Sequence, residues 1–163
     1  MSLSTRELRE FVETLAGTPE LWRDRVRHSA DGRVYEQIWD DELVNAWVIC
    51  WSEDQDTGFH DHDESTAAIA VISGQVREDR LRLGSPPTSQ VIRAGSSFTV
   101  PPEAIHRVLH SGNRPAVTVH AYSPPLVRSG AYRIGEHGEL LREVLTVEEE
   151  LRAEALAAEA LTA

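Results

Sequence analysis

Two histidines separated by a single residue are the first feature of this chain that could do chemistry. His60 and His62 flank Asp61, just before an apolar run over residues 65–73. Alternate side chains of an extended segment point to the same side, so both imidazoles can face one metal ion. A His-x-His pair alone is more often an exposed pair on a strand or loop, and that interpretation stays open at this point.

A third histidine strengthens the metal interpretation. His106 ends the segment 95–106, which passes through a turn and into another expected strand. In an antiparallel barrel, strands far apart in sequence can place His106 opposite His60 and His62. Imidazole is a good ligand for several divalent transition metals, so the three histidines are candidate ligands of one ion.

The elements that must position these histidines are short strands. From Val34 to about Tyr122, runs rich in Val, Ile, Thr and aromatic residues are broken by Gly, Pro, Asn, Asp and Ser. Many short strands at such spacing favour a small barrel or sandwich that closes its own edges. The expected strands are 33–39, 43–51, 65–73, 75–83, 89–93, 97–101, 106–110 and 115–122.

Helices are expected before the barrel. Ser4 and Glu7 form a capping-box pattern ahead of apolar residues at helical spacing, and Gly17 ends the run. A second short helix is predicted to start at Thr18, which precedes a proline. The N-terminal helices therefore cover about residues 4–28.

A helix is also expected at the other end of the chain. Residues 146–162 begin with a second capping box, Thr146 and Glu149, and their five Glu and one Arg give this segment a net charge of −4. The segment from Pro124 to Leu145 has no clear pattern, and we expect it to wrap the barrel. Residues 127–163 are thus a C-terminal extension and helix.

Composition sets broad limits on function. The chain has 163 residues, 40% hydrophobic and 26% charged, which fits one globular domain over 1–163. Sixteen Lys and Arg against twenty-seven Asp and Glu give a net charge of −11, which disfavours nucleic-acid and membrane-surface partners. No signal peptide or apolar run of about 20 residues is visible, so we expect a cytoplasmic protein, a monomer or small homo-oligomer. The single cysteine, Cys50, excludes an intrachain disulfide.

The segment that holds the first two histidines resembles the first motif of the cupin superfamily. His60 and His62 match its His-x-His, and Gly74 stands at its closing position. Most cupins place a fourth, carboxylate ligand where this chain has Ala67. Three neutral imidazoles leave the metal with more positive charge and with open positions, which a thiolate and dioxygen can fill.

The segment that holds the third histidine resembles the second cupin motif. Gly95, Pro101 and His106 match the motif, while Glu103 replaces a glycine and His110 replaces an asparagine. The resemblance implies an all-β fold: a small double-stranded β-helix, or jelly-roll barrel, over about 33–126, with helices at both ends.

Four elements in order resemble the cysteine dioxygenase family, the thiol dioxygenases of the cupin superfamily. They are Cys50-Trp51, His60-Asp-His62, residues 105–108 (IHRV) and residues 115–125 (PAVTVHAYSPP). The resemblance covers roughly residues 33–126. It implies a non-haem iron(II) enzyme that adds both atoms of dioxygen to a small thiol and releases a sulfinic acid.

The resemblance also implies roles for individual residues. His60, His62 and His106 are the expected Fe(II) ligands. Tyr122 and His120, with Thr118 where the family usually has Ser, are the expected network that orients substrate and oxygen. A phenol can donate a hydrogen bond to an oxygen species, and a neighbouring imidazole fixes its orientation.

The choice of thiol depends on residues upstream of the barrel motifs. Tyr35 and Gln37 fall where cysteine-specific members have Tyr-x-Arg, and Trp51 is expected beside them at the substrate. Gln offers only neutral donors to a carboxylate, and the resemblance to Gln-type bacterial members places 3-mercaptopropionate ahead of cysteine. Trp39 and Trp47 are expected in packing; as pocket walls they would instead favour a cationic thiol such as ergothioneine.

Several further residues are expected near the site without a role in its chemistry. Mammalian-type members carry a Cys–Tyr cross-link whose cysteine position is Ala67 here, so we expect no thioether between Cys50 and Tyr122. Arg128 and Arg133 are expected as solvated charges, with binding of a substrate carboxylate as the alternative.

Two other functions remain open from the sequence. One is a different metal-dependent cupin enzyme that acts on a substrate without a thiol. The other is a non-catalytic cupin that binds a small molecule.

Overall fold

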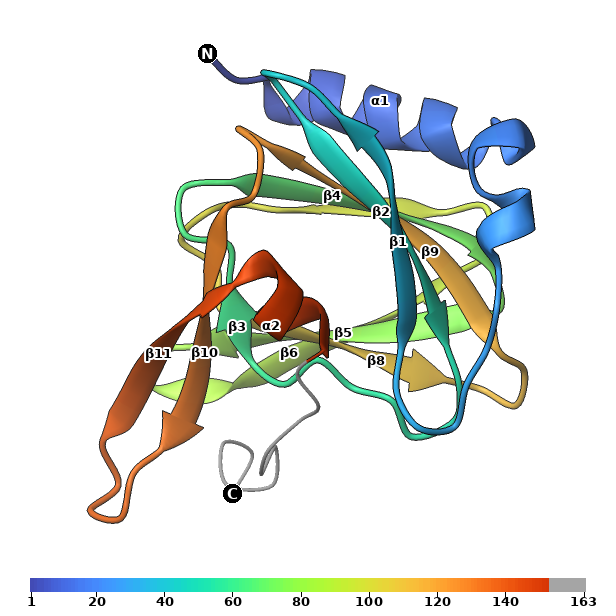
Figure 1. The fold of residues 1–163 in the computed structure, drawn as a ribbon. Helices are drawn as coiled ribbons and strands as arrows, with labels where there is room; N and C mark the ends of the chain where they lie inside the picture. Colours follow the sequence, from blue (N-terminus) through green and yellow to red (C-terminus); the bar gives the residue numbers. More distant parts are fainter. Residues whose placement is uncertain (153–163) are drawn as a thin grey trace.

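Two β-sheets face each other and close into a barrel (Figure 1). The structure is a computed structural model and describes residues 1–152. The first sheet has the order β1 (Val34–Asp40), β2 (Asn45–Trp51), β9 (Ala116–Ser123), β4 (Thr66–Ser73) and β7 (Ser97–Val100). The second has the order β11 (Leu140–Thr146), β10 (Arg128–Ile134), β3 (His60–Asp61), β8 (His106–Ser111), β5 (Gln75–Arg82) and β6 (Ser85–Arg93). All pairings are antiparallel, and the eight expected strands are present with shifted ends.

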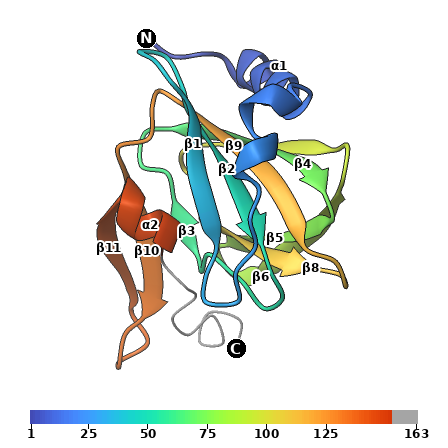
Figure 2. The ribbon, with the colours of Figure 1, turned by 45° about the vertical axis from the view of Figure 1, so that its right-hand side comes forward.

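Strand β9 shows how alternation builds two separate cores. All of its residues are buried, because the barrel interior covers one face and helix α1 (Thr5–Ala16) covers much of the other. Val119 and Ala121 contact α1 together with Ala68 and Ala70 of β4. These short side chains let the helix lie close to the sheet (Figure 2).

The N-terminal helix begins as the sequence predicts. The Ser4 side chain accepts a hydrogen bond from the Glu7 backbone, and the Glu7 carboxylate accepts one from the Ser4 backbone, which confirms the capping box. The side chains buried by the helix recur at helical spacing: Leu8, Val12 and Leu15.

The second N-terminal helix begins where the sequence predicts, with Thr18 as its N-cap, but it is not an α-helix. It consists of two short 3-10 helices, Pro19–Leu21 and Arg23–Arg25. Trp22 lies between them with a φ of −132°, outside the helical range, and its indole N–H donates to the Ala16 carbonyl at 3.2 Å. This bond ties the chain back onto the end of α1, so α-helical structure does not propagate past Gly17.

The segment from Pro124 to Leu145 contains a hairpin that the sequence did not reveal. Strands β10 and β11 pair with each other, and β10 also extends the second sheet by pairing with β3. Most of β11 is exposed, so its apolar residues do not alternate with polar ones in the way that identifies a half-buried strand. Helix α2 (Val147–Arg152) follows directly; the remainder of the helix expected over 146–162 lies outside the described residues.

The C-terminal capping box is present. The Thr146 hydroxyl accepts from the Glu149 backbone at 3.3 Å, and the Glu149 carboxylate accepts from the Thr146 backbone at 2.8 Å. No helix in the part of the chain that the structure describes has the length and apolar character to cross a membrane.

Gly74 provides a test of the barrel's packing. It has a φ of +68°, and a Cβ added there would lie 2.5 Å from the Pro115 carbonyl oxygen. We expect Gly74→Ala to lower the free energy of unfolding by at least about 3 kcal/mol, because left-handed strain adds to a backbone clash. Urea denaturation measures the change.

Gly84 is the matched control for this substitution. Its φ is +67°, but a Cβ there would meet nothing within 4 Å. Gly84→Ala should therefore cost only the conformational strain, about 1–2 kcal/mol. Equal losses in the two variants would show that the contact with Pro115 does not matter.

Candidate metal centre

The three histidines are brought together by the short strand β3. His60 begins this strand, Asp61 ends it and His62 follows. On one side His60 is paired with His106, the first residue of β8, and on the other side with Ala131 of β10. Pairing across β3 and β8 thus joins two histidines that are 46 positions apart in the sequence.

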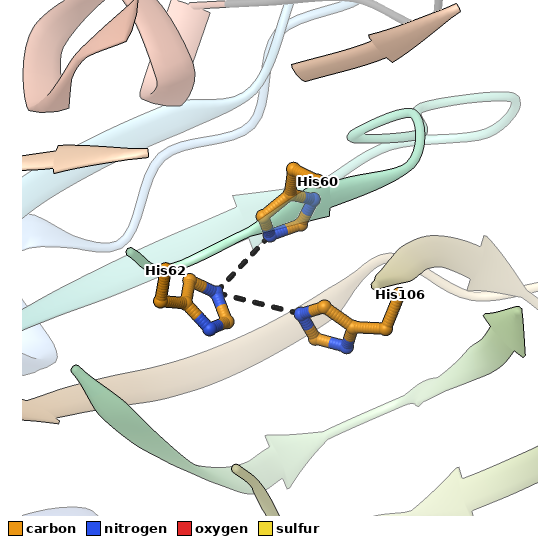
Figure 3. A group of neighbouring side chains, drawn as sticks. All are labelled: His60, His62 and His106. Carbon is orange, nitrogen blue, oxygen red and sulfur yellow. Dashed lines mark hydrogen bonds between the residues drawn. The ribbon is translucent and has the colours of Figure 1, made fainter. Parts of the chain in front are cut away.

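The Nε2 atoms of the three rings converge (Figure 3). The Nε2 of His62 lies 3.2 Å from that of His60 and 3.4 Å from that of His106. The three side chains are buried, and their ligand atoms all lie within 4.8 Å of one another. This is the grouping that the sequence predicted.

The protonation of the rings fits a metal ion. Burial, reinforced by the charge of the neighbouring rings, holds the pKa of His62 and of His106 below the usual range, so these imidazoles are neutral. The Nδ1 of His60 lies 3.0 Å from the Gly58 carbonyl, and that of His106 lies 3.0 Å from Glu78. Since both acceptors require an Nδ1–H donor, the Nε2 lone pairs of these two rings point at the centre of the group. Convergent lone pairs repel one another unless a cation lies between them.

Glu78 is a site residue that the sequence analysis missed. It lies on β5, is 1% exposed, and accepts hydrogen bonds from His106 and, at 2.7 Å, from Arg80. A carboxylate in this position fixes the ring orientation of a metal-binding histidine. The sequence signal for Glu78 was a charged residue at a position of the strand 75–83 that faces the barrel interior. Several other residues of this strand are also charged, so Glu78 does not stand out in the sequence.

Thr118, His120 and Tyr122 alternate along β9 and form a buried line into the barrel. The His120 ring reaches the Thr118 hydroxyl at 3.0 Å and the Tyr122 hydroxyl at 3.4 Å. The Trp51 indole donates to the same Thr118 oxygen at 2.9 Å. The ring centroid of Tyr122 lies 5.1 Å from that of His62, so the line ends beside the three histidines.

Burial keeps this line of side chains uncharged. It lowers the pKa of His120 to about 3, with a further contribution from the charge of Arg33. It also raises the pKa of Tyr122 well above its usual value. At neutral pH the network is therefore a neutral imidazole beside a protonated phenol.

The three residues expected at the substrate differ in their surroundings. Trp51 is fully buried, and its ring is stacked near His120. Tyr35 is partly buried against the interior core, and its hydroxyl accepts from Arg152 at 3.0 Å. Gln37 lies opposite Trp47 on the neighbouring strand, but its side chain is exposed.

Two charged residues beside the site were not anticipated. The guanidinium of Arg33, just before β1, lies 5.4 Å from the centroid of the Trp51 ring. Glu150, on helix α2, is buried, with Oε1 3.6 Å from the Nε2 of His60. Neither residue belongs to a sequence motif that would identify it as part of the site, because both come close to the histidines only through tertiary packing.

Asp61 joins the site to the C-terminal hairpin. Burial alone would raise the pKa of Asp61, but hydrogen bonds from Arg142 and Tyr132 hold it well below its usual value. Asp61 is therefore a buried anion with defined partners. Its partners hold β11 and β10 against β3.

The other expected residues lie outside the chemistry. Cys50 packs with Val48 and Val117 in a cluster separate from the one that contains Tyr122. The exposed Arg128 donates to Asp63 at 2.6 Å.

The two remaining tryptophans and His110 also have ordinary surroundings. Trp47 is buried in the core with its edge toward Tyr122, and Trp39 contacts Phe11 at the surface. His110 lies on the strand of His106 and contacts the Arg114 carbonyl.

A cavity of about 260 Å³ opens beside the histidines. Its lining includes His62, Ser65, Pro124 and Arg128. The peptide bond between Ser123 and Pro124 is cis, and it ends β9 one residue after Tyr122.

Sequence comparisons identify similar proteins. A family model described as cysteine dioxygenase type I matches residues 3–134. Cysteine dioxygenase type 1 of Danio rerio is 26% identical over 151 residues, which cover 83% of this chain and 74% of that protein. The bovine enzyme of the same name is 26% identical over 90 residues, and the match covers 50% of this chain and 45% of that protein.

Structural comparisons show the fold. A conserved protein from Klebsiella pneumoniae with a double-stranded β-helix domain gives a TM-score of 0.55 at 20% identity, covering 63% of this chain and 80% of its own. A cupin superfamily protein from Desulfitobacterium hafniense gives a TM-score of 0.54 at 7% identity, and the match covers 63% of this chain and 87% of that protein. The expected cupin fold is confirmed.

Removal of one histidine tests the metal centre. We expect His62→Ala to weaken Co(II) binding at least about 100-fold, because two imidazoles no longer define the site. Anaerobic titration followed by Co(II) absorption measures the affinity. His110→Ala should bind as the unaltered protein does; a His62→Ala variant that also retained full affinity would show that these histidines do not hold the ion.

Proposed function

The chain belongs to the cysteine dioxygenase type I family, and on that premise we propose that it is an iron(II) enzyme that oxidises a small thiol to its sulfinic acid. The family acts on a small thiol with dioxygen, and the described residues include a buried three-histidine site. The convergence of the three Nε2 atoms is the observation that carries the proposal. The proposed substrates are 3-mercaptopropionate and cysteine, with ergothioneine as a third candidate.

His60, His62 and His106 would hold the iron. When bound, iron(II) would lower the pKa of a thiol, so that sulfur binds as thiolate, and would bring the thiolate together with dioxygen, whose four-electron reduction is balanced by oxidation of the sulfur to the sulfinate. The three imidazoles would be neutral ligands, and Ala67 of β4 leaves the first motif without the carboxylate that most cupins have there. An iron ion held by these three histidines would therefore keep open coordination positions for the thiolate and dioxygen.

The chain's own contribution is a directed line of hydrogen bonds. Trp51 can only donate, so the Thr118 oxygen accepts from it and the Thr118 hydroxyl is free to donate to Nε2 of His120. Nδ1–H of His120 then donates to the Tyr122 oxygen. This assignment leaves the Tyr122 O–H to donate toward the centre, where it would orient substrate and oxygen. The threonine retains the hydroxyl that the family usually takes from serine.

The charge of Arg33 supports a substrate that carries a carboxylate. Its guanidinium lies over Trp51 and acts electrostatically on both His120 and Tyr122. Both 3-mercaptopropionate and cysteine have a carboxylate, and a positive charge near the site favours either of them. Arg33 itself is held by other contacts, among them its hydrogen bond to the Glu150 carbonyl.

Two alternatives predict different behaviour in one experiment. A cupin enzyme with another substrate would bind iron but consume no oxygen with thiols. A binding protein without catalytic activity would bind a small molecule but would convert no substrate and consume no oxygen. The buried line from Thr118 to Tyr122 favours the thiol dioxygenase, because simple binding does not need an oriented phenol.

Oxygen uptake tests the proposed activity. We expect iron-loaded protein to consume oxygen with at least one of 3-mercaptopropionate, cysteine, cysteamine and ergothioneine, and to form the sulfinic acid. Mass spectrometry with labelled dioxygen should place both oxygen atoms in the product. If iron-loaded protein consumed no thiol-dependent oxygen across this panel, the proposal would be abandoned.

The role of Gln37 has its own test. Gln37→Arg adds a charged partner for a substrate carboxylate, so kcat/KM for cysteine should rise by about 10-fold relative to that for cysteamine, which has no carboxylate. Ser85→Arg adds the same charge at an exposed position of β6 and should leave the ratio unchanged. An unchanged ratio in Gln37→Arg would show that this residue does not face the substrate.

A further inference from the structure

Glu150 brings a carboxylate to the metal centre from a part of the chain that is remote from both cupin motifs. Helix α2 lies between the β10–β11 hairpin and β1 in both ribbon views (Figures 1 and 2). The Glu150 side chain is 6% exposed, and Oε1 lies 3.6 Å from the Nε2 of His60. The carboxylate therefore borders the three-histidine group.

Contacts on both sides of Glu150 hold it in place. Its backbone carbonyl accepts a hydrogen bond from the Arg33 guanidinium at 3.2 Å. The next residue, Leu151, is buried in the interior core. Arg152 donates to the Tyr35 hydroxyl at 3.0 Å, so α2 is fixed at two points to the chain where β1 begins. The carboxylate is a positioned group in the barrel wall.

One oxygen of this carboxylate has no partner among residues 1–152. Oε2 is buried and makes no hydrogen bond to these residues. An unpaired buried carboxylate oxygen is costly, so its persistence indicates a donor or cation that arrives with a ligand. The chain contains no lysine, so no side-chain ammonium of this protein can meet it.

The metal ion is a poor candidate for that partner. The donor atoms within 4.8 Å of one another belong to His60, His62 and His106, and Glu150 is not one of the group. Glu150 instead lies at its edge, next to His60, and its charge also acts on Tyr122. A molecule that binds the metal through sulfur would bring its other groups to this edge.

We propose that Glu150 is a specificity-determining residue that binds the cationic nitrogen of the thiol substrate. In an aminothiol the ammonium lies two carbons from the sulfur, which is near enough for one molecule to reach both the metal and the neighbouring carboxylate. The substrate class is therefore thiols with a positively charged nitrogen. This inference rests on the proposed function and selects among its substrates.

Glu150 and Gln37 favour different substrates. Gln37 is a neutral, exposed amide that disfavours an amino-acid carboxylate only by lacking a charge. Glu150 is a buried carboxyl group, and electrostatic interactions at a buried position are screened far less than those of an exposed group. Glu150 therefore decides the ranking, and cysteine is preferred over 3-mercaptopropionate.

Matched pairs of thiols test this role. Cysteine and 3-mercaptopropionate differ by an ammonium group, and cysteamine and 2-mercaptoethanol differ by ammonium against hydroxyl. We expect Glu150→Gln to reduce the kcat/KM ratio within each pair by about 10- to 100-fold, the range of a hydrogen bond to a charged group. Glu148→Gln, an equal charge change at an exposed position of the same helix, should leave both ratios unchanged.

Anaerobic thiol binding provides a readout that does not depend on turnover. Thiolate-to-Co(II) absorption gives a Kd for each thiol in the Co(II)-loaded protein, and Glu150→Gln should weaken only the aminothiols. Its affinity for Co(II) itself should stay within about threefold of the unaltered protein, well short of the change expected for a lost ligand.

Two results would overturn the inference. One is an equal loss for both members of each pair. The other is a Co(II) affinity at least 10-fold weaker, which would make Glu150 a metal ligand or a structural residue. If the protein oxidised no thiol but still bound aminothiols in a Glu150-dependent way, the proposed activity would fail while this inference stood.

Discussion

Mutual repulsion of buried imidazole lone pairs is the constraint around which this barrel is built. Gly58 and Glu78 accept the Nδ1 protons of His60 and His106, which turns both Nε2 atoms inward. Burial lowers the pKa of His62 and of His106, so neither ring adds an imidazolium charge to this group at neutral pH. A divalent cation bound between the three rings would satisfy their Nε2 atoms together. Three features of the fold surround the histidines: the Glu78 carboxylate next to His106, the buried line of side chains on β9, and helix α2 beside His60.

The charged groups near the centre differ in whether they have partners, and this difference separates structural roles from functional ones. Asp61 is held by Arg142 and Tyr132, and Glu78 by Arg80 and His106, so both carboxylates are satisfied within the fold. The carboxylate of Glu150 is half satisfied at best. A satisfied buried anion holds neighbouring elements in place, whereas an unsatisfied one is available to a ligand.

The sequence predicted those parts of the site that depend on local spacing. His60 and His62, or His120 and Tyr122, are two apart on extended chain, and alternation alone puts each pair on one face. It did not predict Glu150, because that residue reaches the site only after the β10–β11 hairpin has folded back onto β3. It also missed the hairpin itself, since β11 is largely exposed and lacks alternation. At the N-terminus, the tie from Trp22 to Ala16 overrode the α-helical pattern that the sequence showed.

The shortness of β3 has a consequence for how the centre opens. Two residues carry this strand, and its neighbours on either side are β8 and β10. Release of the β10–β11 hairpin would expose His60 while α1, β4 and β9 stayed packed, so the two events have separate free energies. Exchange of an ion held by the three histidines would then follow a local opening of β10 and β11 and would not require global unfolding. In amide hydrogen exchange, β3 and β10 would form one unit that is protected less than the sheet beneath α1.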